Sequence, residues 1–303
     1  MSRIEVAVTC YNYARFLRQC VESVLTQSHR DCRVLIIDDA STDETPVIAA
    51  ALAAEDDRVT VLRHPVNLGH IATYNEAIRL AQGDYFLLLS ADDFLLPGAL
   101  ERAAATLDSR SDIGLVVGRS LRDEPQRGAA DGMGAQSGAA TILEPAAFIW
   151  GLVLDNWIAT ATAITRTAVQ KKLGGYLAAL PHSGDLEMWL RFALRSRIAY
   201  LDVPQAVYRR HDSNMSHKYS GLDDFTQRNA AILMHLGAIR AMPHCGRSLE
   251  RRIRLRLLTL CVLRAGLTLT RGQPGQARSL LARAKSLACG RGPGSVMDAD
   301  PGH

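Results

Sequence analysis

The sequence predicts an α/β fold: a mostly parallel, Rossmann-like sheet flanked by helices, followed by a helical C-terminal extension. Apolar runs of four to seven residues alternate five times with segments whose apolar residues recur at helical spacing. Such alternation is typical of parallel strands joined by right-handed helical crossovers. After residue 220 the strand-like runs stop, and only helical periodicity continues.

The first 118 residues contain the alternation. The strands are expected, in order, at 4–10, 33–38, 59–62, 85–89 and 113–117. The helices between them are expected at 16–27, 46–54, 71–81 and 97–107. Each strand is an apolar run too short for a helix, and each helix repeats apolar residues three or four positions apart. The run from Tyr85 to Leu89 does not alternate with polar residues, which favours a strand buried on both faces.

Residues 119–220 are less regular. The stretch 119–140 is rich in Gly, Ala and charge without any period, which indicates a surface loop. Helices are then expected at 145–154 and 185–194, strands at 158–165, 198–203 and 206–208, and a turn at 174–176. These elements are too few to build a core of their own, so we expect them to pack against residues 1–118.

The C-terminal part, residues 221–303, is expected to be a helical extension. Helical patterns at 249–267 and 276–287 are separated by Gly272-Gln273-Pro274-Gly275, which predicts a hairpin. Arginine is frequent here, and Glu250 is almost the only acid near the cluster 251–256. This basic face can be solvated, contact a subunit, or lie on an anionic membrane surface. The last residues, 290–303, are expected to be disordered.

Composition excludes several classes of protein. The net charge of +4 gives no reason to expect nucleic-acid binding, and the six cysteines show neither a CxxC pair nor metal-ligand spacing. The chain opens directly in a strand-like segment, and its apolar stretches are shorter than the roughly 20 residues of a membrane span. We therefore expect a cytoplasmic protein, with peripheral contact at the inner membrane face through the basic helices as an open alternative.

Polar side chains follow the ends of four expected strands. They are Asn12, the pair Asp38-Asp39, Asn67 and the pair Asp92-Asp93. In an open α/β sheet these positions meet at one edge, where ligands bind. The chain has neither a GxGxxG nor a GxxxxGK[ST] motif, so a phosphate-bearing ligand would need a divalent cation held by oxygen ligands, Mg²⁺ or Mn²⁺. The alternative for the last pair is that Asp93 caps the next helix and Asp92 is solvated.

With these residues the chain resembles the inverting family 2 glycosyltransferases with the GT-A fold, over roughly residues 4–216. The matching segments are, in order, Thr9 to Asn12 with Phe16-Leu17, Ile36 to Asp43, Asn67-Leu68-Gly69 with Asn75, Leu88 to Asp93, Gly184 to Glu187, and Tyr208 to Ser216. Each segment alone is a weak signal. Their order and spacing together are specific.

The resemblance implies a role for each of these segments. Tyr11, Asn12, Asp38, Asp39, Asn67 and Gly69 would form the nucleotide pocket, with Tyr11 stacking and Asp39 hydrogen bonding. A purely structural role remains open for Asp38, and turn formation alone would explain Asn67 and Gly69. Asp92, Asp93 and His211 would hold the metal beside the diphosphate, and Arg209, Arg210, His211 and Ser216 would cover the leaving group.

The resemblance also implies a catalytic base. Asp185 matches the carboxylate that deprotonates the acceptor hydroxyl, and Glu187 is the reserve candidate. A helix start that merely favours acids is the alternative for Asp185. Ser90 departs from the family pattern, because it stands where the first aspartate of an Asp-x-Asp metal motif is expected.

Together these inferences predict a hexosyltransferase-like enzyme that uses Mn²⁺ or Mg²⁺ and a nucleotide-sugar donor, with a UDP-sugar favoured. Residues 1–118 would bind the donor and residues 119–220 the acceptor, which is expected to be a glycan or a lipid-linked intermediate. Two alternatives stay open: an inactive nucleotide-sugar-binding protein, motivated by Ser90, and a sugar nucleotidyltransferase. The segment Tyr11-Asn12-Tyr13-Ala14 disfavours the latter, because it lacks the Gly-rich basic loop of that class.

Overall fold

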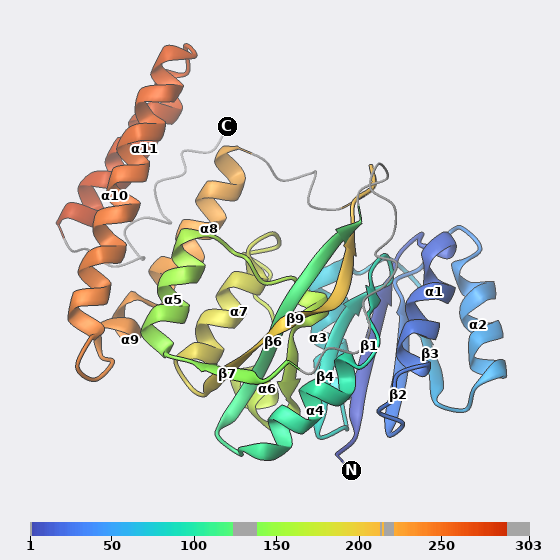
Figure 1. Ribbon diagram of the computed structural model, residues 1–303. Helices are drawn as coiled ribbons and strands as arrows, with labels where there is room; N and C mark the ends of the chain where they lie inside the picture. Colours follow the sequence, from blue (N-terminus) through green and yellow to red (C-terminus); the bar gives the residue numbers. More distant parts are fainter. Residues whose placement is uncertain (1, 124–137, 213, 215–220, 290–303) are drawn as a thin grey trace. The chain divides into compact units, whose positions relative to one another are not determined.

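The computed structural model describes residues 2–123, 138–212, 214 and 221–289 (Figure 1). The chain divides into two compact units. The first comprises residues 1–145 and 157–218, and the second comprises residues 146–156 and 219–303. Among the described residues, no helix is both long enough and apolar enough to cross a membrane.

The first unit is built on one sheet of nine strands. Its strand order is β3-β2-β1-β4-β8-β6-β9-β5, and β7 pairs with β9. The strands are β1 (Ile4–Cys10), β2 (Cys32–Asp38), β3 (Val59–Arg63), β4 (Tyr85–Ser90), β5 (Phe94–Leu95), β6 (Ile113–Asp123), β7 (Ala140–Leu143), β8 (Ile164–Arg166) and β9 (Arg197–Arg209). The four strands from β3 to β4 are parallel, as the sequence predicts.

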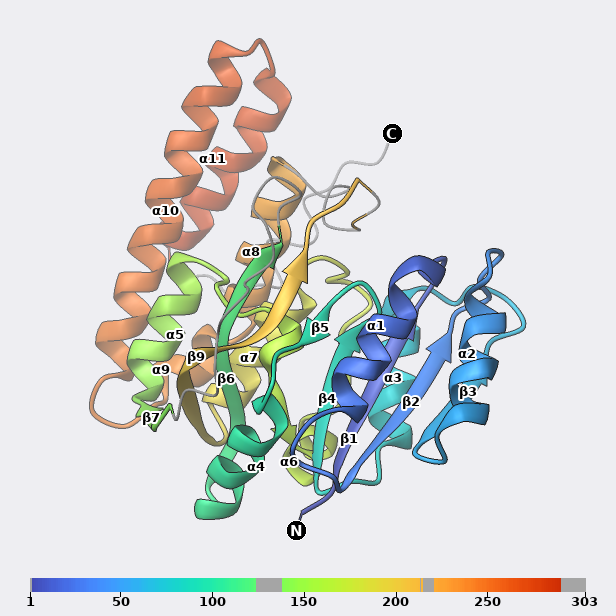
Figure 2. The same cartoon turned by 45° about the vertical axis from the view of Figure 1, so that its right-hand side comes forward.

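Helices cover both faces of this sheet (Figures 1 and 2). They are α1 (Ala14–Leu25), α2 (Thr45–Glu55), α3 (His70–Leu80), α4 (Ala99–Ser109), α6 (Thr167–Leu173) and α7 (Gly184–Ala193). Alternate residues of β1, such as Val6 and Val8, join the apolar core under α1, α2 and α4. Helix α3 contacts β1, β2 and β4 and packs on α6, which in turn packs on α7. The expected helices of this unit are confirmed to within a few residues.

Three expectations for the strands are wrong. The segment expected as a strand at 158–165 contains a short 3-10 helix, Thr160–Thr162, and only its last two residues belong to β8, which runs antiparallel to β4 and β6. The two expected strands at 198–208 are one strand, β9, and β6 continues to Asp123, into the expected loop. The register of the β6–β9 pair shifts around Arg119 and Pro204. A pair of strands with such a bulge tolerates a proline. The bulge depends on how β6 pairs with β9, so it cannot be predicted from the sequence of either strand alone.

The second unit is helical. It comprises α5 (Pro145–Leu154, from residue 146), α8 (Leu222–Met234), α9 (Leu236–Arg240), α10 (Gly246–Thr270) and α11 (Pro274–Ala288). The hairpin of α10 and α11, with its break near Gly272, is confirmed. The sequence-based division placed residues 146–156 with the segment 119–220, but they group here with the C-terminal helices. The expectations of a loop at 124–137 and of disorder at 290–303 lie outside the described residues.

Candidate active site

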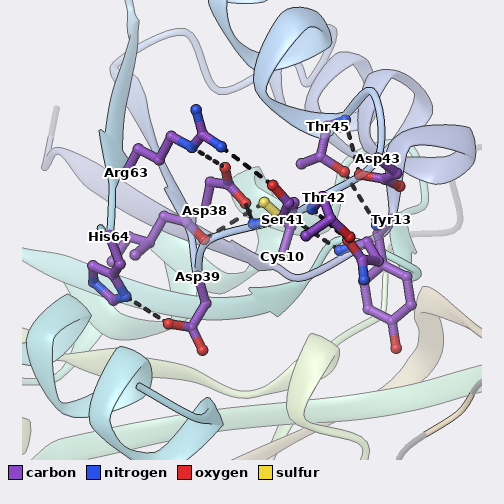
Figure 3. Close-up of polar contacts among 12 residues, drawn as sticks. Cys10, Tyr13, Asp38, Asp39, Ser41, Thr42, Asp43, Thr45, Arg63 and His64 are labelled. Carbon is purple, nitrogen blue, oxygen red and sulfur yellow. Dashed lines mark hydrogen bonds and ion pairs between the residues drawn. The ribbon is translucent and has the colours of Figure 1, made fainter. Parts of the chain in front are cut away.

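The loops that follow β1 and β2 interlock at the carboxyl edge of the sheet (Figure 3). The backbone N–H of Asn12 donates to Ser41 Oγ at 2.9 Å, and the N–H of Thr42 donates to Asn12 Oδ1 at 2.8 Å. Asn12 and Ala40 both have positive φ, 58° and 61°. Such conformations cluster at functional sites, where surrounding contacts impose them. Asn12, a predicted nucleotide ligand, therefore holds the two loops together, and Tyr11 beside it is 45% exposed.

Asp38 is fully buried and acts inside its own loop. Its Oδ1 accepts the Ser41 N–H at 3.0 Å, and its Oδ2 lies 3.2 Å from Arg63 Nε. Arg63 also donates to the Ser41 carbonyl oxygen at 3.2 Å. The carboxylate thus shapes the loop after β2, the structural role that the sequence left open for it.

Asp39 holds the turn after β3. Its Oδ1 accepts the Leu68 N–H at 2.8 Å, and its Oδ2 accepts the Gly69 N–H at 2.9 Å. The exposed Asn67 closes the same turn by accepting the Gly69 N–H at 3.0 Å, and Gly69 has a φ of 83°. These contacts bring Asn67 and Gly69 beside Asp39, and the turn role of Asn67 is an Asx-type hydrogen bond.

His64 links Asp39 to helix α3. Its Nδ1 lies 2.7 Å from Asp39 Oδ1, and its Nε2 lies 2.7 Å from Glu76 Oε2 (Figure 3 shows the first contact). Glu76 is paired in turn with Arg79 at 2.7 Å. Burial disfavours the charged imidazolium, but the hydrogen bonds to Asp39 and Glu76 outweigh it and raise the pKa of His64.

This contact predicts how stability depends on pH. Because the folded-state pKa of His64 is raised, its contribution to stability is fully present below the unfolded pKa of about 6.5 and is lost as pH rises through the folded pKa. We expect the free energy of unfolding of the wild type, relative to that of a His64→Gln variant, to fall as pH rises from about 6.5 through the folded-state pKa of His64. Urea unfolding across the pH range measures this difference, and a difference that grows with pH would contradict the charged state of His64.

The acidic pair after β4 is buried and differs in its contacts. Asp93 Oδ1 accepts the Arg209 N–H at 3.0 Å, and Arg209 Nη1 donates to the Asp92 carbonyl oxygen at 2.8 Å. Arg209 also donates to Gln19 and lies over the rings of Phe16 and Phe94. Burial, and then the charge of Asp92, raise the pKa of Asp93 well above its usual range. Asp93 therefore anchors the end of β9, while the Asp92 carboxylate faces other partners.

His211 is the principal partner of Asp92. Its Nε2 lies 3.2 Å from Asp92 Oδ2, and its ring packs on Phe16 and edge-on against Tyr13. Its Nδ1 is buried without a hydrogen-bond partner among the described residues. Asn214 fixes this segment by accepting the His211 N–H at 2.5 Å. Arg210, predicted beside it, is exposed, and Ser216 lies outside the described residues.

The metal set predicted from sequence is assembled only in part. Within the described ranges, no three His, Cys, Asp or Glu side chains cluster as ready metal ligands. Asp93 Oδ1 is turned to the Arg209 amide, and the role of Asp93 as a metal ligand stays a prediction. Asp92 and His211 remain as an adjacent carboxylate and imidazole. This pair fits a cation that takes most of its ligands from phosphate oxygens and water, as Mg²⁺ commonly does.

Asp185 stands in the first turn of α7 and shares a neighbour with Asp92. Burial, and then the negative charges of Asp92 and Asp185, raise the pKa of Tyr74. Burial and the charge of Asp185 likewise raise the pKa of Tyr176, whose ring lies 5.5 Å from that of Tyr74. Tyr74 thus lies within electrostatic reach of both carboxylates, although they come from β4 and α7.

Two side chains of α3, Asn75 and His70, hold the segment that precedes α7. Asn75 Oδ1 accepts the Tyr176 N–H at 2.6 Å, and Asn75 Nδ2 donates to the Tyr176 carbonyl oxygen at 2.9 Å. His70 Nε2 lies 2.8 Å from the Pro181 carbonyl oxygen. A side chain at Gly175 would collide with Asn75, because an added Cβ would lie 2.2 Å from Asn75 Oδ1. Helix α3 therefore positions the approach to Asp185.

Glu187, the reserve candidate for the base, is held in a buried ion pair. It is 1% exposed, and its Oε2 accepts hydrogen bonds from Arg191 at 2.7 and 3.0 Å. Arg191 also donates to the carbonyl oxygens of Leu173 and Gly175. Glu187 therefore completes an ion pair that ties α7 to the turn before it, and it is not carried forward as a base.

Sequence reasoning assigned no role to His64, Tyr74 or Asn75. Asn75 stands within the segments that carry the family resemblance, and this position was a usable signal. His64 and Tyr74 gave no signal in the sequence. His64 matters because it contacts Asp39 and Glu76, and Tyr74 because it lies near Asp92 and Asp185, and all four carboxylates are distant in sequence or on another element.

Comparisons with known proteins identify a family over part of the chain and related folds over most of it. Residues 5–133 match the family model Glycosyl transferase family 2. The chain is 28% identical over 217 residues to EpsE of Bacillus subtilis, which carries a glycosyltransferase name, covering 70% of this chain and 74% of that protein.

Solved structures share the fold. The first 349 residues of TarS from S. aureus, in complex with UDP-GlcNAc, superpose with a TM-score of 0.62 at 16% identity, covering 95% of this chain and 92% of that one. The mannosyltransferase PcManGT from Pyrobaculum calidifontis, in complex with GDP-Man and Mn²⁺, gives 0.56 at 18% identity, covering 95% and 87%. Residues 5–133 thus form a glycosyl transferase family 2 domain within a GT-A-type fold, and the protein is a glycosyltransferase.

Proposed function

We propose that the enzyme is an inverting, metal-assisted glycosyltransferase that moves a sugar from a nucleotide-sugar donor to an acceptor hydroxyl. The observation that carries the proposal is the adjacent carboxylate and imidazole of Asp92 and His211, 3.2 Å apart, in a chain whose residues 5–133 match glycosyl transferase family 2. Asp92 would act at the diphosphate of the bound donor, and Asp185 of α7 would act at the attacking hydroxyl.

The loops after β1, β2 and β3 would bind the nucleotide. Tyr11 offers an exposed ring for stacking on the base. Asp39 is held rigidly by two backbone N–H groups and His64, which suits a carboxylate that must recognise a base or ribose. We favour a UDP-sugar, and the TarS complex with UDP-GlcNAc supports this choice by fold alone.

Asp92 and His211 would hold the divalent cation beside the diphosphate. When bound, Mn²⁺ or Mg²⁺ would neutralise the charge that develops on the leaving nucleoside diphosphate. The fold neighbour PcManGT is seen with Mn²⁺. The exposed Arg210 would add positive charge near the same phosphates.

Asp185 would be the general base. It would take the proton of the acceptor hydroxyl as that oxygen attacks the anomeric carbon on the face opposite the leaving diphosphate. One displacement of this kind inverts the anomeric configuration. The acceptor would be a glycan or a lipid-linked intermediate, bound by residues from the segment 119–220.

Ser90 supports a second candidate, an inactive protein that binds nucleotide sugars. It is uncharged where the family motif has an aspartate, and its carbonyl oxygen accepts hydrogen bonds from Cys20 and Asp93. Such a protein would bind the donor without turning it over.

The test is donor turnover by the full chain. We expect nucleoside diphosphate release from a UDP-sugar in the presence of Mn²⁺, and loss of that release when EDTA removes the metal. The thermal midpoint should rise with donor and Mn²⁺ together, because a ligand that binds only the folded state stabilises it. Binding without release would favour the inactive alternative. Pyrophosphate release from a nucleoside triphosphate and a sugar phosphate would instead show a nucleotidyltransferase.

A further inference from the structure

Basic charge in this protein is concentrated in the α10–α11 hairpin. Residues 246–288 carry ten Arg or Lys residues and one Glu, whereas the other 260 residues carry 25 basic and 30 acidic residues. The single acid, Glu250, is buried and paired with Arg254. The hairpin is therefore strongly positive on a chain whose remainder is negative.

Helix α10 also exposes aliphatic side chains. They are Leu255, Val262, Leu263, Leu267 and Leu269, which are between 48% and 65% exposed. The opposite side of the helix is buried, through residues such as Ile253, Leu257 and Cys261. Five exposed aliphatic side chains on one helix exceed the scattered single residues that are normal for a soluble surface. We call this outward side the α10 face.

A groove of about 400 Å³ lies at the start of the α10 face. Trp150 of α5 forms one wall, and the guanidinium of Arg252 lies 4.3 Å from the centre of its ring. Arg256 lines the groove too, and its Nε is buried without a hydrogen-bond partner among the described residues. The groove therefore combines the Trp150 ring with two guanidinium groups, and the Nε of one of them, Arg256, has no hydrogen-bond acceptor among the described residues.

We propose that the α10 face docks on the surface of an anionic lipid bilayer, with lipid phosphates at the arginines and the leucines among the acyl chains. Charge complementarity selects this occupant. A second copy would bring two strongly positive hairpins together, which is unfavourable, and an RNA would leave the leucines in water. Basic residues beside exposed leucines match an interfacial helix, which binds by apolar burial together with attraction to anionic lipids. The α10 face belongs to the second unit and the proposed catalytic groups to the first, so this proposal does not rest on the catalytic one.

The experiment is vesicle sedimentation of the full chain. Vesicles of phosphatidylcholine alone are compared with phosphatidylcholine and phosphatidylglycerol mixed at about 3:1. We expect binding to the anionic vesicles that is at least about tenfold tighter and that weakens in about 0.5 M NaCl. Equal binding to both vesicle types, or none to either, would overturn the proposal.

Variants separate the two contributions. Leu263→Gln with Leu267→Gln should weaken vesicle binding by about tenfold or more, because apolar burial is lost. Arg251→Gln with Arg252→Gln should remove most of the preference for anionic vesicles. Val47→Gln on α2, which is 71% exposed, is the matched control and should bind as the wild type does. Circular dichroism verifies that each variant is folded.

Two further readouts decide between occupants. Donor hydrolysis without lipid should be unchanged in the leucine variant, so loss of vesicle binding is distinguishable from failure of the catalytic proposal. A stable lipid-free dimer that the leucine variant dissociates would overturn the proposal, because the α10 face would then belong to a second copy.

Discussion

Replacing Asp185 by Asn should abolish most sugar transfer while leaving donor binding nearly intact. A general base typically contributes about 10²–10⁴-fold to the rate, which corresponds to roughly 3–5 kcal/mol of transition-state stabilisation. The amide cannot take a proton, but it keeps the size of the carboxylate. We expect kcat to fall by that factor and the donor Kd, measured by calorimetry with Mn²⁺, to change by less than about threefold.

The matched control for this variant is Asp202→Asn. Asp202 is also an aspartate of the first unit, on β9, and its side chain is 76% exposed. It should transfer sugar at the wild-type rate. If Asp185→Asn keeps more than about a tenth of wild-type kcat, Asp185 is not the base, because such a loss is too small for general-base catalysis.

Replacing Asp92 by Asn should act on the metal and the donor diphosphate. Asp92 is the carboxylate that His211 contacts at 3.2 Å, and Asp93 beside it is turned to the Arg209 amide. Loss of this negative charge removes the strongest oxygen ligand that the site offers to a hard cation. We expect the apparent Kd for Mn²⁺ in donor binding to rise by at least roughly 10–100-fold. Losses in this range are typical even when the mutated residue only contacts a direct metal ligand.

Titration of Mn²⁺ at fixed donor measures this effect. Higher Mn²⁺ should recover part of the activity of the Asp92→Asn variant, whereas it should not rescue Asp185→Asn. An unchanged Mn²⁺ titration curve would show that the cation is held elsewhere. The Asp202→Asn variant again serves as the control.

Local patterns were sufficient to predict the parallel half of the sheet. The strand β1 alternates in polarity and then runs apolar, and its bounds, Ile4–Cys10, agree with the sequence-based range. Polar residues directly after β1, β2 and β4 meet at one edge because parallel strands end together there. Asp39, Asn67 and Gly69 were therefore expected near one another, and they lie in contact.

Long-range pairing could not be read from local patterns. The short strand β8 runs antiparallel between β4 and β6, and β9 continues through Pro204 because β6 pairs with it. Similarly, Glu187 follows Asp185 by two residues, but its carboxylate is buried in an ion pair with Arg191 of the same helix. His64 receives its significance from Asp39 and Glu76, on either side of it in the chain. Such contacts depend on the assembled fold rather than on any one segment.

The central claim is that Asp92 and Asp185 act on the same donor in the same step. A double-mutant cycle tests it most directly, using kcat/KM for donor turnover in Asp92→Asn, Asp185→Asn and the combined variant. Groups that serve one transition state are strongly non-additive, so the combined variant should be no more than about tenfold slower than the worse single variant. Losses that multiply fully would mean that the two carboxylates work independently, which contradicts a shared site.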